Sequence, residues 1–143
     1  MIEEGFYYLN LAFGDSLNRY YLEALIASLH AQATTFDSTD WKKIAFLYDQ
    51  LETIFPSPLV TLNRILAQSY LNPFLSCLQE LESMNDLPSS RIQFFISAAK
   101  GDISLRSGEL LKAEVAFKQA LALAPSTRER QLMEKYLKDC KSN

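Results

Sequence analysis

The feature that most constrains this chain is a two-proline turn between two amphipathic segments in residues 40–64. Before the turn, apolar residues recur at the three- and four-residue spacing of one helix face. They are Trp41, Ile44, Ala45, Tyr48, Leu51 and Phe55. Pro56 and Pro58 end that helix, because proline has no N–H donor and restricts the residue before it. The same spacing restarts after the turn, so the segment predicts two helices, the first capped by Thr39 or Asp40.

Helical periodicity extends over the rest of the chain. No segment alternates with the two-residue period of a β-strand. A turn at Gly14-Asp15-Ser16 separates the first two helices, and Gly108 is expected to end the sixth. We therefore predict a single all-α domain over residues 1–143, with about eight antiparallel helices. They cover about 2–13, 18–36, 40–55, 58–71, a fifth helix from Phe74, 91–107, 109–124 and an eighth helix that follows Pro125-Ser126.

The segment 101–125 carries an ordered pattern of small, aromatic and proline residues. They are Gly101, Gly108, Ala113, Phe117, Ala120 and Pro125. The order matches a tetratricopeptide repeat, in which small residues let paired helices approach closely and the aromatic residue fills the gap. Ser97, Lys100 and Ser104 stand where the repeat has large apolar residues. We therefore predict a degenerate tetratricopeptide-like array, with the last helix as its polar cap.

The composition argues against a membrane protein or a secreted one. Apolar residues make up 48% of the 143 residues, which is typical of a globular chain, and no apolar run is long enough to span a bilayer. Glu3 and Glu4 stand where a secretion signal needs positive charge. Cys77 and Cys140 are expected to be buried thiols in a reducing compartment, not a disulfide or a metal site. We therefore expect a cytoplasmic location and no membrane contact.

No set of residues predicts catalysis or cofactor binding. His30 is the single histidine, so a two-histidine metal site is excluded within one chain, and we interpret it as a helix–helix contact. There is no glycine-rich phosphate loop. Acids and bases alternate in the last helix, as in Arg128, Glu129 and Arg130, which is typical of a solvated face and not of a nucleic-acid interface. We expect no enzyme, no cofactor, no metal and no direct nucleic-acid binding.

Two positions have both a structural and a binding interpretation. Trp41 either packs between the second, third and fourth helices or anchors a partner, because tryptophan is enriched at interface hot spots. Asn63 and Arg64 interrupt an otherwise apolar helix, and a partly buried polar side chain needs hydrogen-bond partners. Arg64 therefore either joins an internal network, with Asp40 or Asp49, or contacts a partner.

These residues resemble a known family over nearly the whole chain. The sequence is similar to the C-terminal, tetratricopeptide-like extension of a group of bacterial extracytoplasmic-function RNA polymerase sigma factors. The similar stretches read IEEGFYYLN, YYLEALIASLHAQA, TDWKKIAFLYDQLETIFPSPLVTLNR, and the last repeat with ERQLMEKYL. The third stretch is the most specific. The family's usual Arg-Ala in the sixth helix is Ala99-Lys100 here.

The resemblance implies a non-catalytic regulatory domain that acts on transcription initiation. Its partners would be the sigma factor's own N-terminal regions, core RNA polymerase or a signalling protein. The regions that bind polymerase and read the promoter are not in this sequence, so we do not expect this chain alone to recognise a promoter. The alternative is a freestanding helical-repeat adaptor that binds a peptide or protein partner unrelated to transcription. The candidate partner-binding residues are His30, Trp41, Asp49, Asn63 and Arg64.

Overall fold

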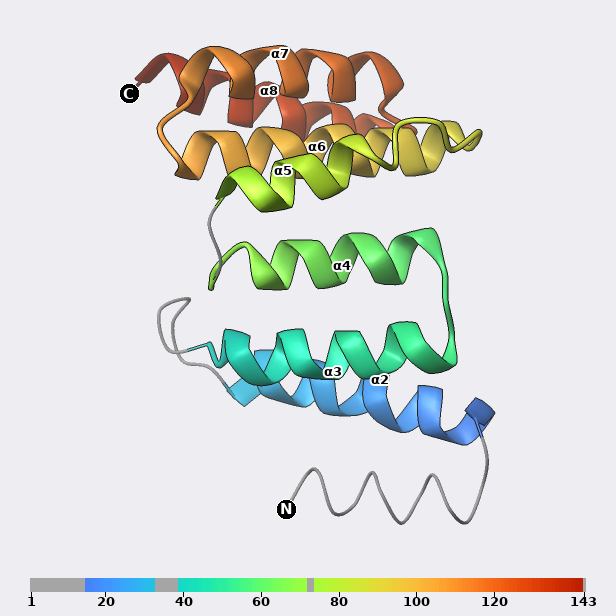
Figure 1. The fold of residues 1–143 in the computed structure, drawn as a ribbon. Helices are drawn as coiled ribbons and strands as arrows, with labels where there is room; N and C mark the ends of the chain where they lie inside the picture. The colour runs from blue at the N-terminus through green and yellow to red at the C-terminus, as the bar shows by residue number, and fades with distance from the viewer. Residues whose placement is uncertain (1–14, 33–38, 72–73, 143) are drawn as a thin grey trace. The chain divides into compact units, whose positions relative to one another are not determined.

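The described part of the chain consists of helices and short turns. The computed structural model describes residues 15–32, 39–71 and 74–142, and within these ranges the all-α prediction is confirmed (Figure 1). The helices are α2 (Asp15–Gln32), α3 (Trp41–Ile54), α4 (Pro58–Gln68), α5 (Phe74–Glu82), α6 (Ser90–Arg106), α7 (Leu110–Leu123) and α8 (Thr127–Ser142). The predicted helix at 2–13 lies outside the described residues. None of these helices combines the length and apolar character that crossing a bilayer requires.

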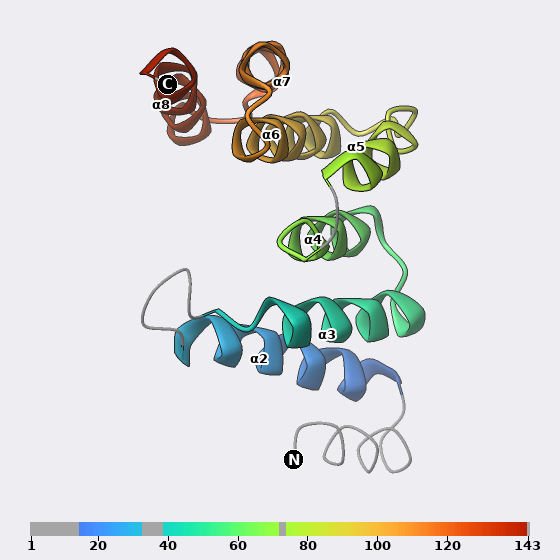
Figure 2. The same cartoon turned by 60° about the vertical axis from the view of Figure 1, so that its left-hand side comes forward.

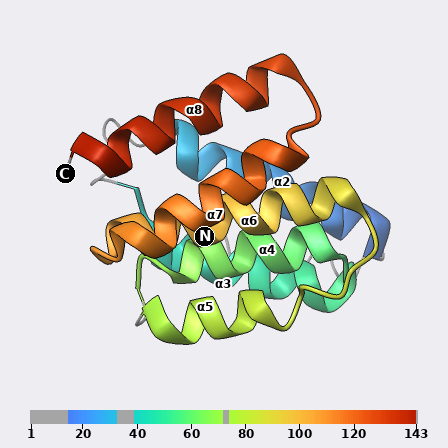
Figure 3. The same ribbon diagram turned by 90° about the horizontal axis from the view of Figure 1, so that it is seen from above.

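The contacts between helices divide the chain into two units, residues 1–71 and 72–143. In the first unit α3 contacts α2 and α4, and in the second α6 contacts α5 and α7, while α7 also contacts α8. Figure 3 shows the helices of the second unit, α5 to α8, from above. Consecutive helices within a unit run antiparallel, as α3 and α4 do (Figure 1). The single-domain organisation over 1–143 stays a prediction.

Local sequence signals set several of the helix ends. The Asp40 side chain accepts a hydrogen bond from the Lys43 N–H at 3.2 Å, which confirms Asp40 as the cap of α3. Ser57 caps α4 through the Val60 N–H at 3.2 Å. Gly108 follows the end of α6 with a φ of 83°, the left-handed conformation that glycine adopts without steric strain.

One predicted boundary was wrong. The turn expected at Gly14-Asp15-Ser16 is not a turn over its last two residues, because α2 begins at Asp15. Acidic and hydroxyl residues favour the first turn of a helix, where the backbone N–H groups have no intrahelical partner and the helix dipole attracts negative charge. The same residue types that indicated a turn are therefore compatible with a helix start.

The core of the first unit lies between the facing sides of α2, α3 and α4. Leu22, Ile44 and Leu51 are enclosed there, and the half-buried Trp41 and Tyr48 pack against them. Full burial of an aliphatic side chain contributes roughly 1.5–3 kcal/mol to folding, so this cluster is the main stabilising element of the unit. Its buried members are Leu22, Ile26, Ile44, Ala45, Leu47, Leu51, Val60 and Ala67.

The core of the second unit is built on small residues that let α6 approach α7. Phe117 of α7 is fully buried, and a Cβ atom placed on Gly101 of α6 would come within 2.5 Å of the Phe117 Cε1 atom. Ala113 and Ala120 flank Phe117 on the same buried face, and the Tyr136 ring of α8 lies 5.3 Å from the Phe117 ring. The small and aromatic residues of the predicted repeat pattern therefore form the contact between paired helices.

This contact predicts that Gly101→Ala destabilises the protein. Alanine improves helix propensity by about 1 kcal/mol, but the added methyl group overlaps an enclosed ring, and overpacking typically costs about 1–3 kcal/mol. We expect the free energy of unfolding, measured by urea denaturation, to fall by up to about 2 kcal/mol, which is the overpacking cost less the gain in helix propensity. In a Phe117→Leu background the same substitution should cost less, because the smaller side chain leaves space. Equal losses in both backgrounds would contradict the steric explanation.

Candidate functional site

The five candidate residues from the sequence all lie in the first unit, and they do not form one surface. His30 is exposed on α2 and Asp49 is exposed on α3, whereas Trp41, Asn63 and Arg64 are partly buried. The structure joins His30 to Trp41 in a ring cluster and places Arg64 in an ionic network.

Trp41 lies at the centre of the ring cluster. Its indole stacks on the Tyr70 ring, with centroids 4.0 Å apart and planes 15° from parallel. The His30 ring meets the indole edge-on at 5.6 Å and 73°. Offset-stacked and edge-to-face rings are the favoured arrangements of aromatic pairs, so Trp41 joins α2 and the turn after α4 to the start of α3. This contact supports the packing interpretation of Trp41 and the helix-contact interpretation of His30.

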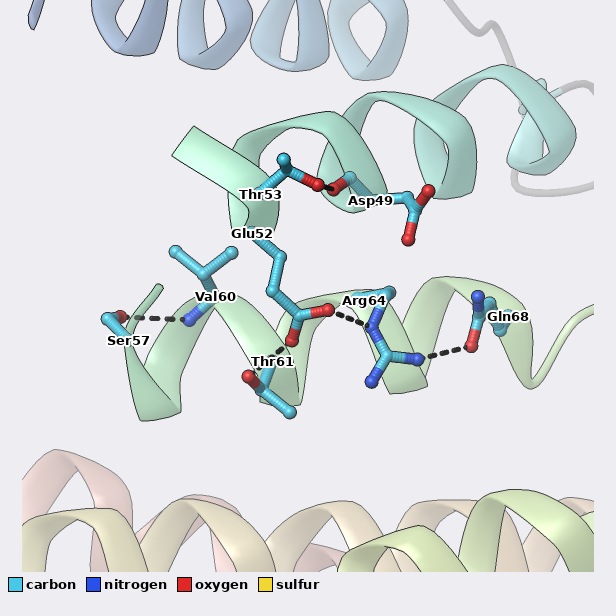
Figure 4. Close-up of polar contacts among 8 residues, drawn as sticks. All are labelled: Asp49, Glu52, Thr53, Ser57, Val60, Thr61, Arg64 and Gln68. Carbon is cyan, nitrogen blue, oxygen red and sulfur yellow. Dashed lines mark hydrogen bonds and ion pairs between the residues drawn. The ribbon is translucent and has the colours of Figure 1, made fainter. Parts of the chain in front are cut away.

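Arg64 forms an internal network between α3 and α4 (Figure 4). Its Nε atom donates to the Glu52 Oε1 atom at 2.9 Å, and its Nη1 atom donates to the Gln68 Oε1 atom at 2.8 Å. The Thr61 hydroxyl donates to the second oxygen of Glu52. The Arg64 side chain is 13% exposed and that of Glu52 26%, so both charges are partly shielded from water. The network therefore joins the two helices that flank the proline turn.

The predicted partners of Arg64 were wrong. Asp40 caps the start of α3, and the Asp49 side chain is exposed, whereas the carboxylate that pairs with Arg64 belongs to Glu52. Asp49 and Glu52 are three residues apart, so their side chains differ by about 60° around the helix axis. Only the packing of α4 against α3 decides which of the two faces Arg64, and helix periodicity alone does not contain that information.

A hollow of about 410 Å³ lies on the first unit, between α2, α3 and the start of α4. His30 and Asn63 line it, together with Tyr48. Burial raises the pKa of the Tyr48 hydroxyl, and the negative charge of Glu23 raises it further. Arg19 pairs with Glu23 at 2.8 Å, and its guanidinium carbon lies 3.5 Å from the centre of the Phe55 ring. The hollow thus holds several polar groups against an aromatic wall.

The larger concave site is a groove of about 960 Å³ in the second unit, lined by α5, α6, α7 and the loop that joins α5 to α6. Figure 2 shows α5 and α7 alongside α6. Four of the five large apolar side chains that are exposed in the described part of this unit line the groove. They are Leu75, Leu111, Val115 and Leu123. Exposed apolar surface gathered in one concavity marks a binding site more often than scattered exposed residues do.

The floor of the groove is a polar stripe along α6. Gln93, Ser97, Lys100 and Ser104 recur at three- and four-residue spacing, and all four line the groove. The Lys100 ammonium group lies 2.9 Å from the Glu82 Oε1 atom and donates to the Asn85 Oδ1 atom at 2.8 Å. The hydrogen bond that Lys100 donates to Glu82 lowers the pKa of the Glu82 carboxyl below its ordinary value. Lys100 therefore holds the end of α5 and the following loop on α6, and its charge lies at the groove.

We did not predict the groove from the sequence, although one signal for it was present. Ser97, Lys100 and Ser104 were interpreted as departures from a repeat, and the structure places them at a concave surface. The exposure of Leu111 and Val115 could not be predicted, because α7 is apolar on several faces and periodicity does not identify which face is buried. The side chains that are buried on α7 are smaller, apart from Phe117.

Buried cysteines and acidic residues do not assemble into a further site within the described ranges. Cys77 and Cys140 are both buried, as predicted, and belong to α5 and α8. No group of three or more histidine, cysteine, aspartate or glutamate side chains is placed to hold a metal ion in this part of the chain.

Replacement of Arg64 tests whether the ionic network is structural. Arg64→Ala leaves the partly buried Glu52 carboxylate without its charged partner, and such a loss typically costs about 1–3 kcal/mol. We expect the free energy of unfolding to fall by that amount. Asp49→Ala, an exposed change on the same helix as Glu52, should stay within about 0.5 kcal/mol of wild type. Non-additivity of Arg64→Ala with Glu52→Gln would locate the loss in this pair, and strict additivity would contradict the assignment.

The raised pKa of Tyr48 leads us to expect that the stability of the protein depends on pH in the alkaline range. The pKa of Tyr48 is raised in the folded protein above its ordinary value of 10.0. As the pH rises from about 10 toward the folded pKa, the unfolded chain loses this proton first, so the free energy of unfolding decreases. Below about pH 9 the contribution is complete and constant. Chemical denaturation between pH 8 and 11 should give a shallower decrease for Tyr48→Phe than for wild type, and identical slopes would contradict the burial of the hydroxyl.

A comparison with curated proteins finds a match in sequence. A protein of Rhizobium meliloti (strain 1021) named as uncharacterized is 36% identical to this chain over 110 residues. The match covers 77% of this chain and 26% of the relative, so the chain corresponds to about a quarter of that protein's length. No family model matches the chain, and no solved structure matches it significantly.

Proposed function

We propose that this chain is a non-catalytic protein-binding domain that regulates transcription initiation as part of a bacterial extracytoplasmic-function sigma factor. It acts by contact with the promoter-reading regions of the factor, with core RNA polymerase or with a signalling protein. The groove of the second unit is the contact surface. The chain contributes binding energy and no chemistry.

The observation that carries this proposal is the concentration of exposed apolar side chains in the groove. Leu75 is 65% exposed, Leu111 is 80% exposed and Val115 is 58% exposed, and all three line one concavity. A folded protein gains nothing in stability from such side chains, whereas a partner that covers them gains roughly 25 cal/mol for each Å² of apolar surface removed from water. The arrangement therefore favours a protein-binding function.

The transcriptional context rests on the resemblance of the four sequence stretches to sigma-factor extensions. One further observation supports a domain within a larger protein: the similar protein from Rhizobium meliloti extends well beyond the matched region. A freestanding adaptor remains the alternative outcome. Its partner would bind the same groove in the absence of any sigma factor or polymerase.

A binding assay with purified components tests the proposal. The 143-residue chain is immobilised, and core RNA polymerase and the promoter-reading half of an extracytoplasmic-function sigma factor from the same organism are passed over it. We expect at least one to bind, and the double variant Leu111→Ser, Val115→Ser to weaken that binding by tenfold or more, equivalent to about 1.4 kcal/mol. Failure of both components to bind would overturn the transcriptional assignment.

The matched control is Leu132→Ser on α8. Leu132 is exposed to 41% and does not line the groove, so its replacement removes a similar side chain from a different face. Both the control and the double variant should unfold within about 0.5 kcal/mol of wild type, as exposed substitutions generally do. Equal loss of binding in the control would indicate that the groove is not the contact surface.

A further inference from the structure

The groove of the second unit has features that narrow the chemistry of its partner, and this inference rests on the protein-binding function proposed above. Its apolar wall on α7 runs from Leu111 through Val115 to Leu123. At 1.5 Å per residue this wall is roughly 18 Å long, the length of about three helical turns. Ala116 and Ala122 also line the groove, and their small side chains leave room for a partner backbone to approach.

The lining excludes several common modes of peptide recognition. Grooves that bind proline-rich segments are lined by aromatic rings, and phosphopeptide sites use arginine clusters. The sixteen residues that line this groove include no aromatic residue and no arginine. The walls and floor belong to helices, so there is no sheet edge here to pair with an extended strand. An amphipathic helix fits, because its backbone hydrogen bonds are satisfied internally and its apolar stripe needs only an apolar wall.

The charges in the groove favour an acidic partner. Lys112 is exposed and takes part in no ion pair among the described residues. Lys100 carries three donors, of which Glu82 and Asn85 occupy two, so one N–H remains for an acceptor. Because Glu82 is the only acid among the described residues of the lining and is already paired with Lys100, these residues together carry a positive charge.

We propose that the groove binds an acidic amphipathic helix of a partner protein. The apolar face of that helix lies between α5 and α7, against Leu75, Leu111 and Val115. Aspartate or glutamate side chains along its edge reach Lys112 and the remaining donor of Lys100. The apolar contacts provide most of the affinity. The two lysines select a partner helix that carries negative charge, and they set the orientation of that helix in the groove.

A peptide-display selection tests this without reference to polymerase or sigma factors. The immobilised 143-residue chain is presented with a library of random 16-residue peptides. We expect the enriched peptides to carry apolar residues at three- and four-residue spacing, with aspartate or glutamate beside them, and to gain helical circular dichroism on binding. Enrichment of basic or proline-containing peptides, or no enrichment, would overturn the proposal. So would a concentration-dependent dimer of the chain that Val115→Ser abolishes, because the occupant would then be a second copy.

Charge reversal makes the test specific to the groove. Lys112→Glu should lower the affinity for the best acidic peptide by about tenfold. It should restore binding of the same peptide with its acidic residues changed to lysine. Lys135→Glu is the matched control, because Lys135 is exposed on α8 outside the groove, and it should change affinity by less than twofold. Equal losses of affinity in Lys112→Glu and Lys135→Glu would overturn the assignment of the peptide-binding site to the groove. A chain that binds acidic helices but neither polymerase nor a sigma factor would retain this proposal and reject the transcriptional one.

Discussion

The contact of Gly101 with the Phe117 ring is the constraint on which the second unit depends. Because no side chain projects from position 101, α6 approaches α7 closely enough to enclose the ring, and Ala113 and Ala120 complete the contact. This fixes which face of α6 is buried. Gln93 and Lys100 lie roughly a quarter-turn around the helix from Gly101, and so they face the groove beside that contact. A packing requirement between two helices thereby creates the floor of the groove.

Much of the fold could be predicted because its signals are local. Asp40 caps the start of α3 and Gly108 follows the end of α6. Both effects depend on interactions among a few neighbouring residues, so the sequence is sufficient to identify them. The start of α2 was misplaced because Asp15 and Ser16 suit both a turn and a first helical turn. The partner of Arg64 was misassigned for a different reason. The choice between Asp49 and Glu52 depends on how α4 lies against α3, which is a tertiary property.

The place of the candidate site could not be predicted from the sequence. The protein-binding function stays a prediction, and the groove lies in the unit that contains none of the five candidate residues. Trp41 and Arg64 attracted attention because tryptophan and arginine are common at interfaces, and both make internal contacts here. Ser97, Lys100 and Ser104 looked like weaknesses of a repeat. Polar residues at expected core positions can instead indicate that the position faces a cavity.

The size of the groove bears on whether it can act as a switch. A partner changes the balance between two states of a factor only by the difference between its affinities for them. Reversing a balance from 1:99 to 99:1 requires about 5.5 kcal/mol of such difference. Full burial of one leucine or valine contributes roughly 1.5–3 kcal/mol, and the four apolar side chains of the groove are between 37% and 80% exposed. Covering what remains exposed would therefore contribute roughly 4–7 kcal/mol, which is comparable to that requirement before the entropy lost on association is subtracted. A helix that reaches the groove in one state only would therefore shift the balance toward that state by the net binding energy that is left after the association entropy is subtracted.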